Sequence, residues 1–180
     1  SKNEKILEDE FTDQGFIIRE VASKDALNKI QNFAIDMLSE RGGSSLDNTH
    51  EIIGINELND FRLEVINKIN AQPWLREAYY DVAKPYLDLL VGNELAMQSR
   101  VNLSIQLPDD DSSLLPVHAD TWSGDSPFEV VVWLPLVDCF STKSMFLLPP
   151  KVADSLSNNF KLHAQGDSEE LFNSIKDEVN

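Results

Sequence analysis

Hydrophobic residues recur every three or four positions along the first half of the chain, and this period predicts helices. Over residues 23–41 the apolar side chains share one helical face, Ser23 is a typical N-cap, and Gly42-Gly43 would end the helix. The same pattern predicts helices over 59–70 and from about 74 to 83. We expect their apolar faces to form the core.

Proline and glycine divide the rest of this half. Pro85 is expected to restart the third helix and Gly92 to end it. Residues 44–58, which include His50, show no clear period and predict an irregular loop. Residues 11–18 predict a short turn followed by a strand.

The hydrophobic period changes to two after Leu95, which is typical of strands. Three further apolar segments, 115–120, 128–137 and 144–148, are also expected to be strands. In the first strand the apolar face is formed by Val101, Leu103, Ile105 and Leu107, and the polar face by Asn102, Ser104 and Gln106. Two interpretations of the polar face stay open: it faces solvent, or it lines a cavity inside a β-barrel.

Composition narrows the choice of partners. The chain has 180 residues, 42% of them hydrophobic, which suits one globular domain. A formal net charge of −16 argues against nucleic acid and anionic membranes as partners. No apolar run is long enough for a membrane span, and the N-terminus has no signal core. The single cysteine, Cys139, cannot form an internal disulfide, which predicts a cytoplasmic protein.

His118 and Asp120 are the candidate metal ligands. Residues two apart on a strand project to the same side, so this imidazole and this carboxylate would lie together. Such a pair supplies two ligands of a 2-His-1-carboxylate triad, which holds non-haem Fe(II). An isolated H-x-D motif is also common in polar loops, so its surroundings decide between the two interpretations.

Those surroundings resemble the phytanoyl-CoA dioxygenase family of Fe(II)/2-oxoglutarate oxygenases. The H-x-D motif is followed by Pro127, by the apolar stretch VVVWLPLVD over 130–138, and by MFLLP over 145–149. An F-x-x-x-G-F motif at 11–16 is similar to the opening of the same family. The chain looks most like the branch associated with surface-carbohydrate biosynthesis.

The resemblance implies an α+β fold in which N-terminal helices pack on a double-stranded β-helix, the jelly-roll or cupin-like barrel. Residues 1–180 would form a single domain: helical support over 1–92, the first half of the β-helix over 93–150, and an insert or connecting segment over 151–180. With about four strands visible, the barrel is expected to be incomplete at the C-terminus. Its exposed strand edge would favour pairing with another chain, as in a homodimer.

The function implied is hydroxylation of a small metabolite, such as a carbohydrate or carbohydrate-linked substrate, with Fe(II) as cofactor and 2-oxoglutarate as co-substrate. His118 and Asp120 would bind the metal. Trp122 would form part of the wall of the substrate pocket, or alternatively pack in the core. The candidates for binding the co-substrate are Asn102, Ser104 and Gln106.

The family's third metal ligand is a later His, followed by an Arg or Lys that binds the far carboxylate of 2-oxoglutarate. Two interpretations compete. In the favoured one the chain is a fragment and these residues lie beyond Asn180. In the other, His163 is the ligand and Lys176 the anchor, although Lys176 falls in a helix predicted over 168–179.

Two alternatives to an active oxygenase also follow. The chain could be a non-catalytic jelly-roll binding module, or a degenerate or truncated oxygenase, since a fold hosts many functions. It could also be a cupin that uses another metal, but such sites gather more histidines than the three in this sequence.

Overall fold

The computed structural model describes residues 2–92, 94–110, 118–141, 143–148 and 150–159. The chain forms two compact units. The larger unit comprises Arg19–Leu114 and Val132–Thr142. The smaller unit comprises Ser1–Ile18, Leu115–Val131 and Lys143–Asn180.

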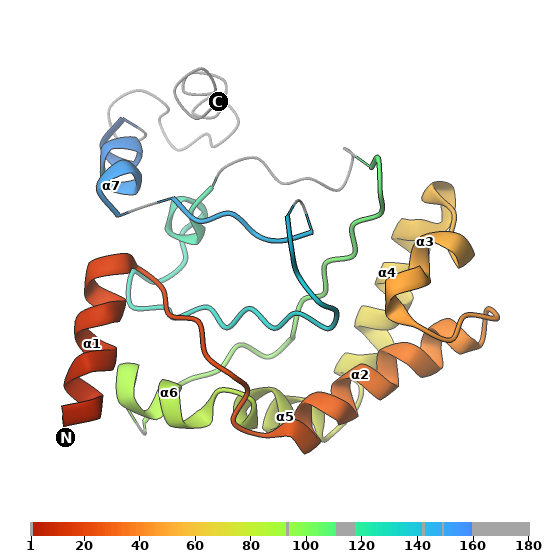
Figure 1. The fold of residues 1–180 in the computed structure, drawn as a ribbon, viewed down its shortest axis with the longest axis horizontal. Coiled ribbons are helices and arrows are strands. Elements are labelled where there is room, and N and C mark those ends of the chain that lie inside the picture. The colour runs from red at the N-terminus through yellow and green to blue at the C-terminus, as the bar shows by residue number, and fades with distance from the viewer. Residues whose placement is uncertain (1, 93, 111–117, 142, 149, 160–180) are drawn as a thin grey trace. The chain divides into compact units, whose positions relative to one another are not determined.

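The larger unit is built on helices, and the helices predicted from the period of 3.6 are present (Figure 1). Ser23 caps α2 as expected, because its Oγ accepts a hydrogen bond of 3.2 Å from the Ala26 backbone N–H. Pro85 lies in the first turn of α6. Gly92, with φ of 97°, follows the end of that helix. The four longest helices of this unit are α2 (Lys24–Ser39), α4 (Ile55–Asn70), α5 (Leu75–Asp81) and α6 (Lys84–Leu90).

The prediction of an irregular loop over 44–58 was wrong. This region contains the short helices η1 (Leu46–Asn48) and α3 (Thr49–Ile52), and α4 already begins at Ile55. A local hydrogen bond explains η1: the Ser45 Oγ accepts the Asp47 N–H at 3.3 Å, which starts the turn without any apolar period. His50 lies exposed on α3.

Two clusters of buried side chains form the core of the larger unit. Phe33 on α2 packs against both clusters, and its ring meets Trp74 edge to face at 6.1 Å between centroids. The first cluster consists of Ala26, Ile30, Ile69, Leu75, Ala78 and Val82. The second consists of Met37, Leu38, Ile53, Leu58, Phe61 and Val65. The sequence prediction that the helical apolar faces form core is confirmed.

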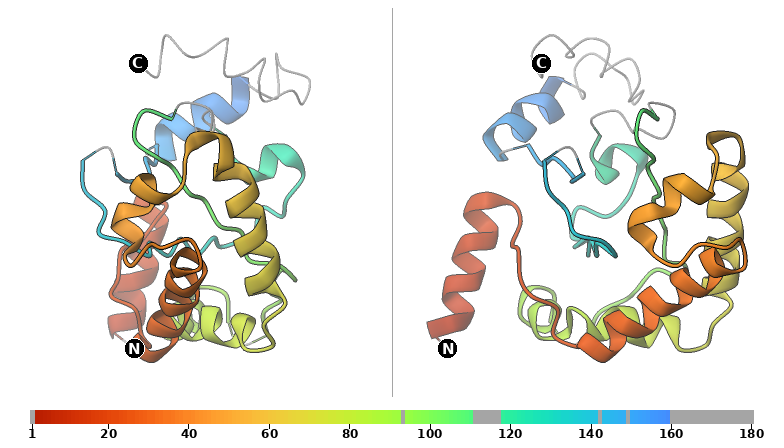
Figure 2. Two further views of the ribbon diagram at one scale, coloured as in Figure 1. Left: turned by 90° about the vertical axis from the view of Figure 1, so that its right-hand side faces the viewer. Right: turned by 45° about the vertical axis from the view of Figure 1, so that its right-hand side comes forward.

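Two extended segments lie against these helices. The apolar face expected for residues 101–107 is turned inward: Val101 packs on the first cluster, and Leu103, Ile105 and Leu107 pack on the second. The polar face, Asn102, Ser104 and Gln106, is exposed. In Figures 1 and 2 this green segment runs beside α4.

The other extended segment covers residues 132–137 and is tied to the helices by side chains. The Tyr79 hydroxyl donates to the Val132 carbonyl oxygen at 2.5 Å, and the Gln31 Nε2 donates to the Leu136 carbonyl oxygen at 2.9 Å. Leu134 and Leu136 pack on the first cluster, whereas Trp133 stays about half exposed at 48%.

The predicted double-stranded β-helix was wrong. Among the described residues the structure has no β-strand, so the segments over 93–150 do not form the first half of a jelly roll or cupin-like barrel. A strand needs a hydrogen-bonded neighbour, and the backbone groups of residues 102–105 bond to none of the described residues. The period of two therefore predicted which side chains face inward, but not a sheet. Residues 128–137 and 144–148 are likewise not strands.

In the smaller unit, a helix replaces one element expected from the sequence, and a second helix lies in a segment for which no element was specified. Helix α1 (Lys2–Gln14) continues through Phe11, where a turn and strand were predicted, and Gly15 with φ of 78° follows it. Helix α7 (Pro150–Asn159) occupies part of the segment expected to be an insert. The helix predicted over 168–179 lies outside the described residues, as does the start of the strand predicted over 115–120.

A membrane span requires a long helix that is almost free of charge, and none of the described helices meets both conditions.

Candidate metal site at His118 and Asp120

The candidate metal ligands lie at the entry to a short 3₁₀ helix of the smaller unit. Asp120 is the first residue of η2 (Asp120–Ser123), where the sequence predicted the end of a strand. Ala119 between the two candidates is extended, with φ of −127° and ψ of 138°. One extended residue between them is enough to put the two side chains on the same side of the backbone.

A glycine and backbone hydrogen bonds shape the chain after Asp120. Gly124 adopts φ of 99°, a left-handed conformation that costs glycine little, and ends η2. The Asp125 N–H donates to the Asp120 carbonyl oxygen at 3.3 Å. The position of Asp120 is therefore held by its own backbone, which leaves its carboxylate for other contacts.

The two side chains lie close to each other. His118 Nε2 is 3.8 Å from Asp120 Oδ1, and the side chains are 46% and 48% exposed. Two neighbouring ligands of an octahedral ion, each bonded at about 2.1 Å, stand about 3.0 Å apart. Because half-exposed side chains can rotate, a small adjustment would allow both atoms to bind one divalent ion. The pair thus fits two positions of a metal site, and metal binding stays a prediction.

A third ligand is not found in the part of the chain that the structure describes, where no three His, Cys, Asp or Glu side chains gather as a metal site would require. His163 and Lys176, the weaker candidates for ligand and 2-oxoglutarate anchor, lie outside the described residues. Their roles remain predictions, as does a ligand beyond Asn180.

The remaining candidates are divided between the two units. Asn102, Ser104 and Gln106 project from the larger unit into solvent. Trp122 lies in η2, two residues after Asp120. Co-substrate binding by the three polar residues and substrate binding by Trp122 stay predictions.

An acidic turn follows Pro108, and one of its carboxylates is not solvated. Asp110 is buried, with 5% of its surface exposed, and its backbone N–H donates to the Leu107 carbonyl oxygen at 3.3 Å. Asp109 adopts φ of 59°, in the left-handed region that Asp tolerates better than most residues.

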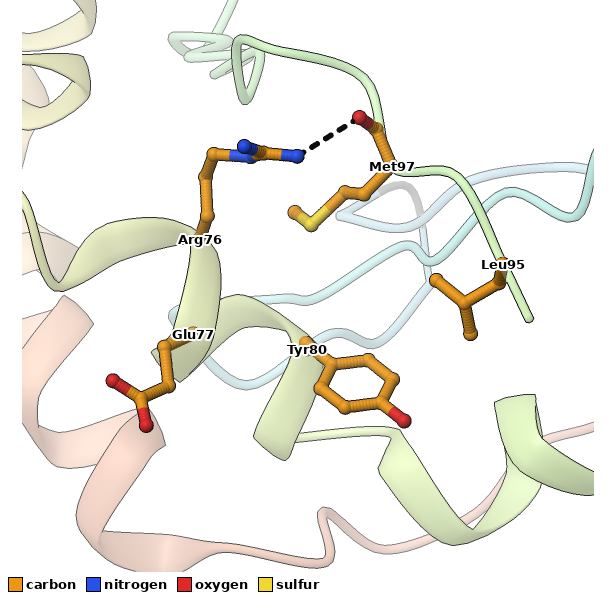
Figure 3. A pocket seen from close by; sticks show the side chains of 5 residues that line it. All are labelled: Arg76, Glu77, Tyr80, Leu95 and Met97. Atoms are coloured by element: carbon orange, nitrogen blue, oxygen red, sulfur yellow. Dashed lines mark hydrogen bonds between the residues drawn. The ribbon is translucent and has the colours of Figure 1, made fainter. Parts of the chain in front are cut away.

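A cavity on the larger unit was not predicted from the sequence. An open cavity of about 430 Å³ is lined by Arg76, Glu77, Tyr80, Leu95 and Met97 (Figure 3). The signals that could have indicated it are the spacing of Arg76 and Tyr80, one helical turn apart, and of Leu95 and Met97, two residues apart. Both spacings can be read from the sequence. Whether the two pairs of side chains lie together depends on the path of the chain after α6.

Comparisons with known proteins add no assignment: the chain matches no protein-family model, no curated protein and no solved structure. The case for a function therefore rests on the residues themselves.

Proposed function

We propose that this chain is an Fe(II)/2-oxoglutarate-dependent oxygenase that hydroxylates a small metabolite. The observation that carries the proposal is the approach of His118 Nε2 to Asp120 Oδ1 at 3.8 Å, on side chains that solvent can reach. The H-x-D motif and the apolar stretches after it, which resemble the phytanoyl-CoA dioxygenase family, support the same activity. The same resemblance implied a jelly-roll fold, which the described residues do not form, so the proposal rests on the motif and on the two candidate ligands.

His118 and Asp120 would supply a neutral nitrogen and an anionic oxygen to Fe(II), the donor set that suits non-haem iron. Bound iron supplies the activation of oxygen that is coupled to decarboxylation of 2-oxoglutarate. The carboxylate of Asp120 offsets part of the cation's charge, and η2 holds this carboxylate beside the imidazole.

The other roles are assigned by resemblance and chemistry. Trp122, two residues after Asp120 in η2, would contact the substrate. A carbohydrate or carbohydrate-linked substrate follows from the resemblance. The cytoplasm, where thiols and Fe(II) stay reduced, suits a chain whose one cysteine, Cys139, is exposed and free.

An anaerobic titration tests the proposal. Fe(II) and 2-oxoglutarate are added to the chain, and a visible charge-transfer band is expected when both bind together. Succinate replaces 2-oxoglutarate in the control, because it lacks the 2-oxo group that chelates the metal and should give no band. Oxygen is then admitted and succinate release from 2-oxoglutarate is measured.

If the chain binds no Fe(II), or if the band is the same with succinate, the oxygenase assignment is wrong. A non-catalytic binding module would then be the better description. The same titration with other divalent ions separates an iron enzyme from a protein that uses a different metal.

A further inference from the structure

The cavity on the larger unit combines the charged side chain of Arg76 with the apolar side chains of Leu95 and Met97. Arg76 and Tyr80 project from the same face of α5, one turn apart. Leu95 and Met97 lie on the chain that returns after α6, and both are half-buried, whereas Glu94, Ala96 and Gln98 are exposed. Figure 3 shows the four side chains around one open space.

The guanidinium of Arg76 is held at the rim of this cavity. Its Nη2 donates to the Met97 carbonyl oxygen at 3.0 Å. This is the one hydrogen bond that the Arg76 side chain makes to the described residues, and a guanidinium carries five N–H donors in a fixed fork. The contact therefore orients the group and leaves N–H donors for a ligand.

Tyr80 forms a fixed aromatic wall. Its hydroxyl donates to Asp88 Oδ1 at 2.5 Å and accepts from Lys84 Nζ at 2.9 Å. Lys84 also pairs with Asp88 Oδ2 at 2.7 Å, so its charge is balanced locally. The pairing raises the pKa of Lys84 and lowers the pKa of Asp88, and both groups stay charged around neutral pH. The Tyr80 ring is therefore anchored at its hydroxyl end. Arg76 supplies the positive charge at the rim, where the carboxylate of Glu77 also lies.

Size and charge together define the class of ligand. A volume of about 430 Å³ falls within the range of about 300–1,000 Å³ typical of small-molecule sites. Aromatic, leucine and methionine side chains favour a flat apolar ligand, which stacks on Tyr80 and contacts the Met97 sulfur. The carboxylate of Glu77 points away from Leu95 and Met97 in Figure 3, so it does not occupy this space.

We propose that this cavity binds a planar aromatic carboxylate, with the ring between Tyr80, Leu95 and Met97 and the carboxylate on the Arg76 guanidinium. An arginine fork and a carboxylate form paired, charge-assisted hydrogen bonds, which are the strongest polar contacts available to such a ligand. The cavity shares no residue with the proposed metal site, because all of its residues belong to the larger unit.

Methyl NMR of the whole chain offers a direct test, because the sequence contains three methionines. With ¹³C-methyl methionine, the Met97 signal reports on the cavity. Met37, which is buried at 3% exposure, and Met145 serve as internal references. The probe is indole-3-acetate, and its neutral counterpart is indole-3-acetamide. The Met97 signal is assigned from its loss in Met97→Leu.

Indole-3-acetate should shift the Met97 methyl signal saturably and leave the Met37 signal in place. Affinity should fall about tenfold for the amide and in Arg76→Gln, the loss expected for a hydrogen bond to a charged group. The affinity of Arg76→Lys should lie between those of the wild type and Arg76→Gln, because lysine keeps the positive charge but lacks the paired N–H donors of the guanidinium. The matched control is Arg62→Gln. It alters a half-buried arginine on α4 that bonds to Asn59, outside the cavity, and should bind like the wild type.

A native Met37 signal shows that each variant is folded. The proposal is overturned if Met97 shows no saturable shift, if acid and amide bind the wild type equally, or if Arg76→Gln binds as well as Arg62→Gln.

Discussion

Replacing Asp120 with alanine removes the anionic partner of His118 at the candidate metal site. Affinity for Fe(II), measured anaerobically, should fall by more than about 100-fold, because loss of an indirect partner of a metal ligand already costs about 10–100-fold. The free energy of unfolding should change by less than about 0.5 kcal/mol, as expected of a half-exposed side chain.

Asp125→Ala is the matched control, since it removes another exposed carboxylate from the same turn. It should bind Fe(II) like the wild type, because its hydrogen bond to the Asp120 carbonyl comes from the backbone. Equal affinities in the two variants would remove Asp120 from the site.

Tyr79→Phe tests how the chain over 132–137 is held. Without the hydroxyl, the Val132 carbonyl oxygen loses its bond of 2.5 Å, and denaturant unfolding should show a loss of about 1 kcal/mol. Tyr86 also donates to a backbone oxygen, that of Glu20, but its bond is exposed. Tyr86→Phe should therefore lower the free energy of unfolding by clearly less than Tyr79→Phe. Equal losses would mean that the bond to Val132 does not hold residues 132–137 in place.

The same tyrosine predicts a dependence on alkaline pH. Burial raises the pKa of Tyr79 above its ordinary value of 10.0. A group with a raised pKa in the folded state contributes stability that is complete below the unfolded pKa and is lost as the pH rises toward the folded pKa. Above about pH 10 the wild type should therefore lose more stability than Tyr79→Phe does. If the free energy of unfolding of the two proteins falls in parallel with rising pH, burial of the Tyr79 phenol does not cause the alkaline loss of stability.

The glycines after α2 play different roles, although they are adjacent. A Cβ on Gly43 would come within 2.5 Å of the Leu38 Cγ, and Leu38 is completely buried. Gly42 has open space around it, but its φ is 87°. Gly43→Ala should cost about 1–3 kcal/mol through overpacking. Gly42→Ala should cost about 1 kcal/mol through backbone strain alone.

The two glycines can be distinguished by adding a second change, Leu38→Ala, which makes room for the new methyl group. Thermal melting should show that Leu38→Ala offsets part of the cost at Gly43 and none of the cost at Gly42. If the stability losses of Leu38→Ala and of each glycine substitution simply add, the contact with Leu38 does not determine the loss of stability in Gly43→Ala.

At the scale of elements, the helices were predictable because their signals are local. The cap at Ser23 and the apolar spacing after it lie within the helix that they specify. Residues 101–107 show the limit of this reasoning. Their alternation correctly predicted which side chains turn toward the helices, but a sheet also needs a neighbouring backbone, which no local pattern supplies.

The candidate site was predictable to the same extent. The adjacency of His118 and Asp120 follows from a spacing of two across one extended residue. A third ligand would come from a distant part of the chain, and the cavity at Arg76 arises where residues 94–97 return to α5. Both depend on tertiary contacts that the period of a sequence does not contain.

At the scale of the larger unit, Phe33 joins the two core clusters. Its side chain packs against both of them and against the Trp74 ring. Phe33→Ala should cost about 2–3 kcal/mol, less than the usual cost of truncating a fully buried phenylalanine, because this one is half-buried. The denaturant dependence of unfolding should also become shallower if the clusters then unfold separately.

Ile30→Val and Val65→Ala provide the comparison, since each affects one cluster. Both should lower stability while leaving the steepness of the transition unchanged. A transition as steep in Phe33→Ala as in these variants would mean that the clusters do not depend on Phe33 for their cooperation.

The extended segment that lies on the helices has a consequence for isotope exchange. Leu103 and Ile105 have packed side chains, yet their amide groups bond to none of the described residues. The amides of α4 beyond its first turn are hydrogen-bonded within the helix. Amide protons exchange with deuterium when they lack such bonds and water can reach them. Residues 102–105 should therefore take up deuterium early, as an unfolded stretch does, even though the methyl groups of Leu103 and Ile105 stay packed against the second cluster.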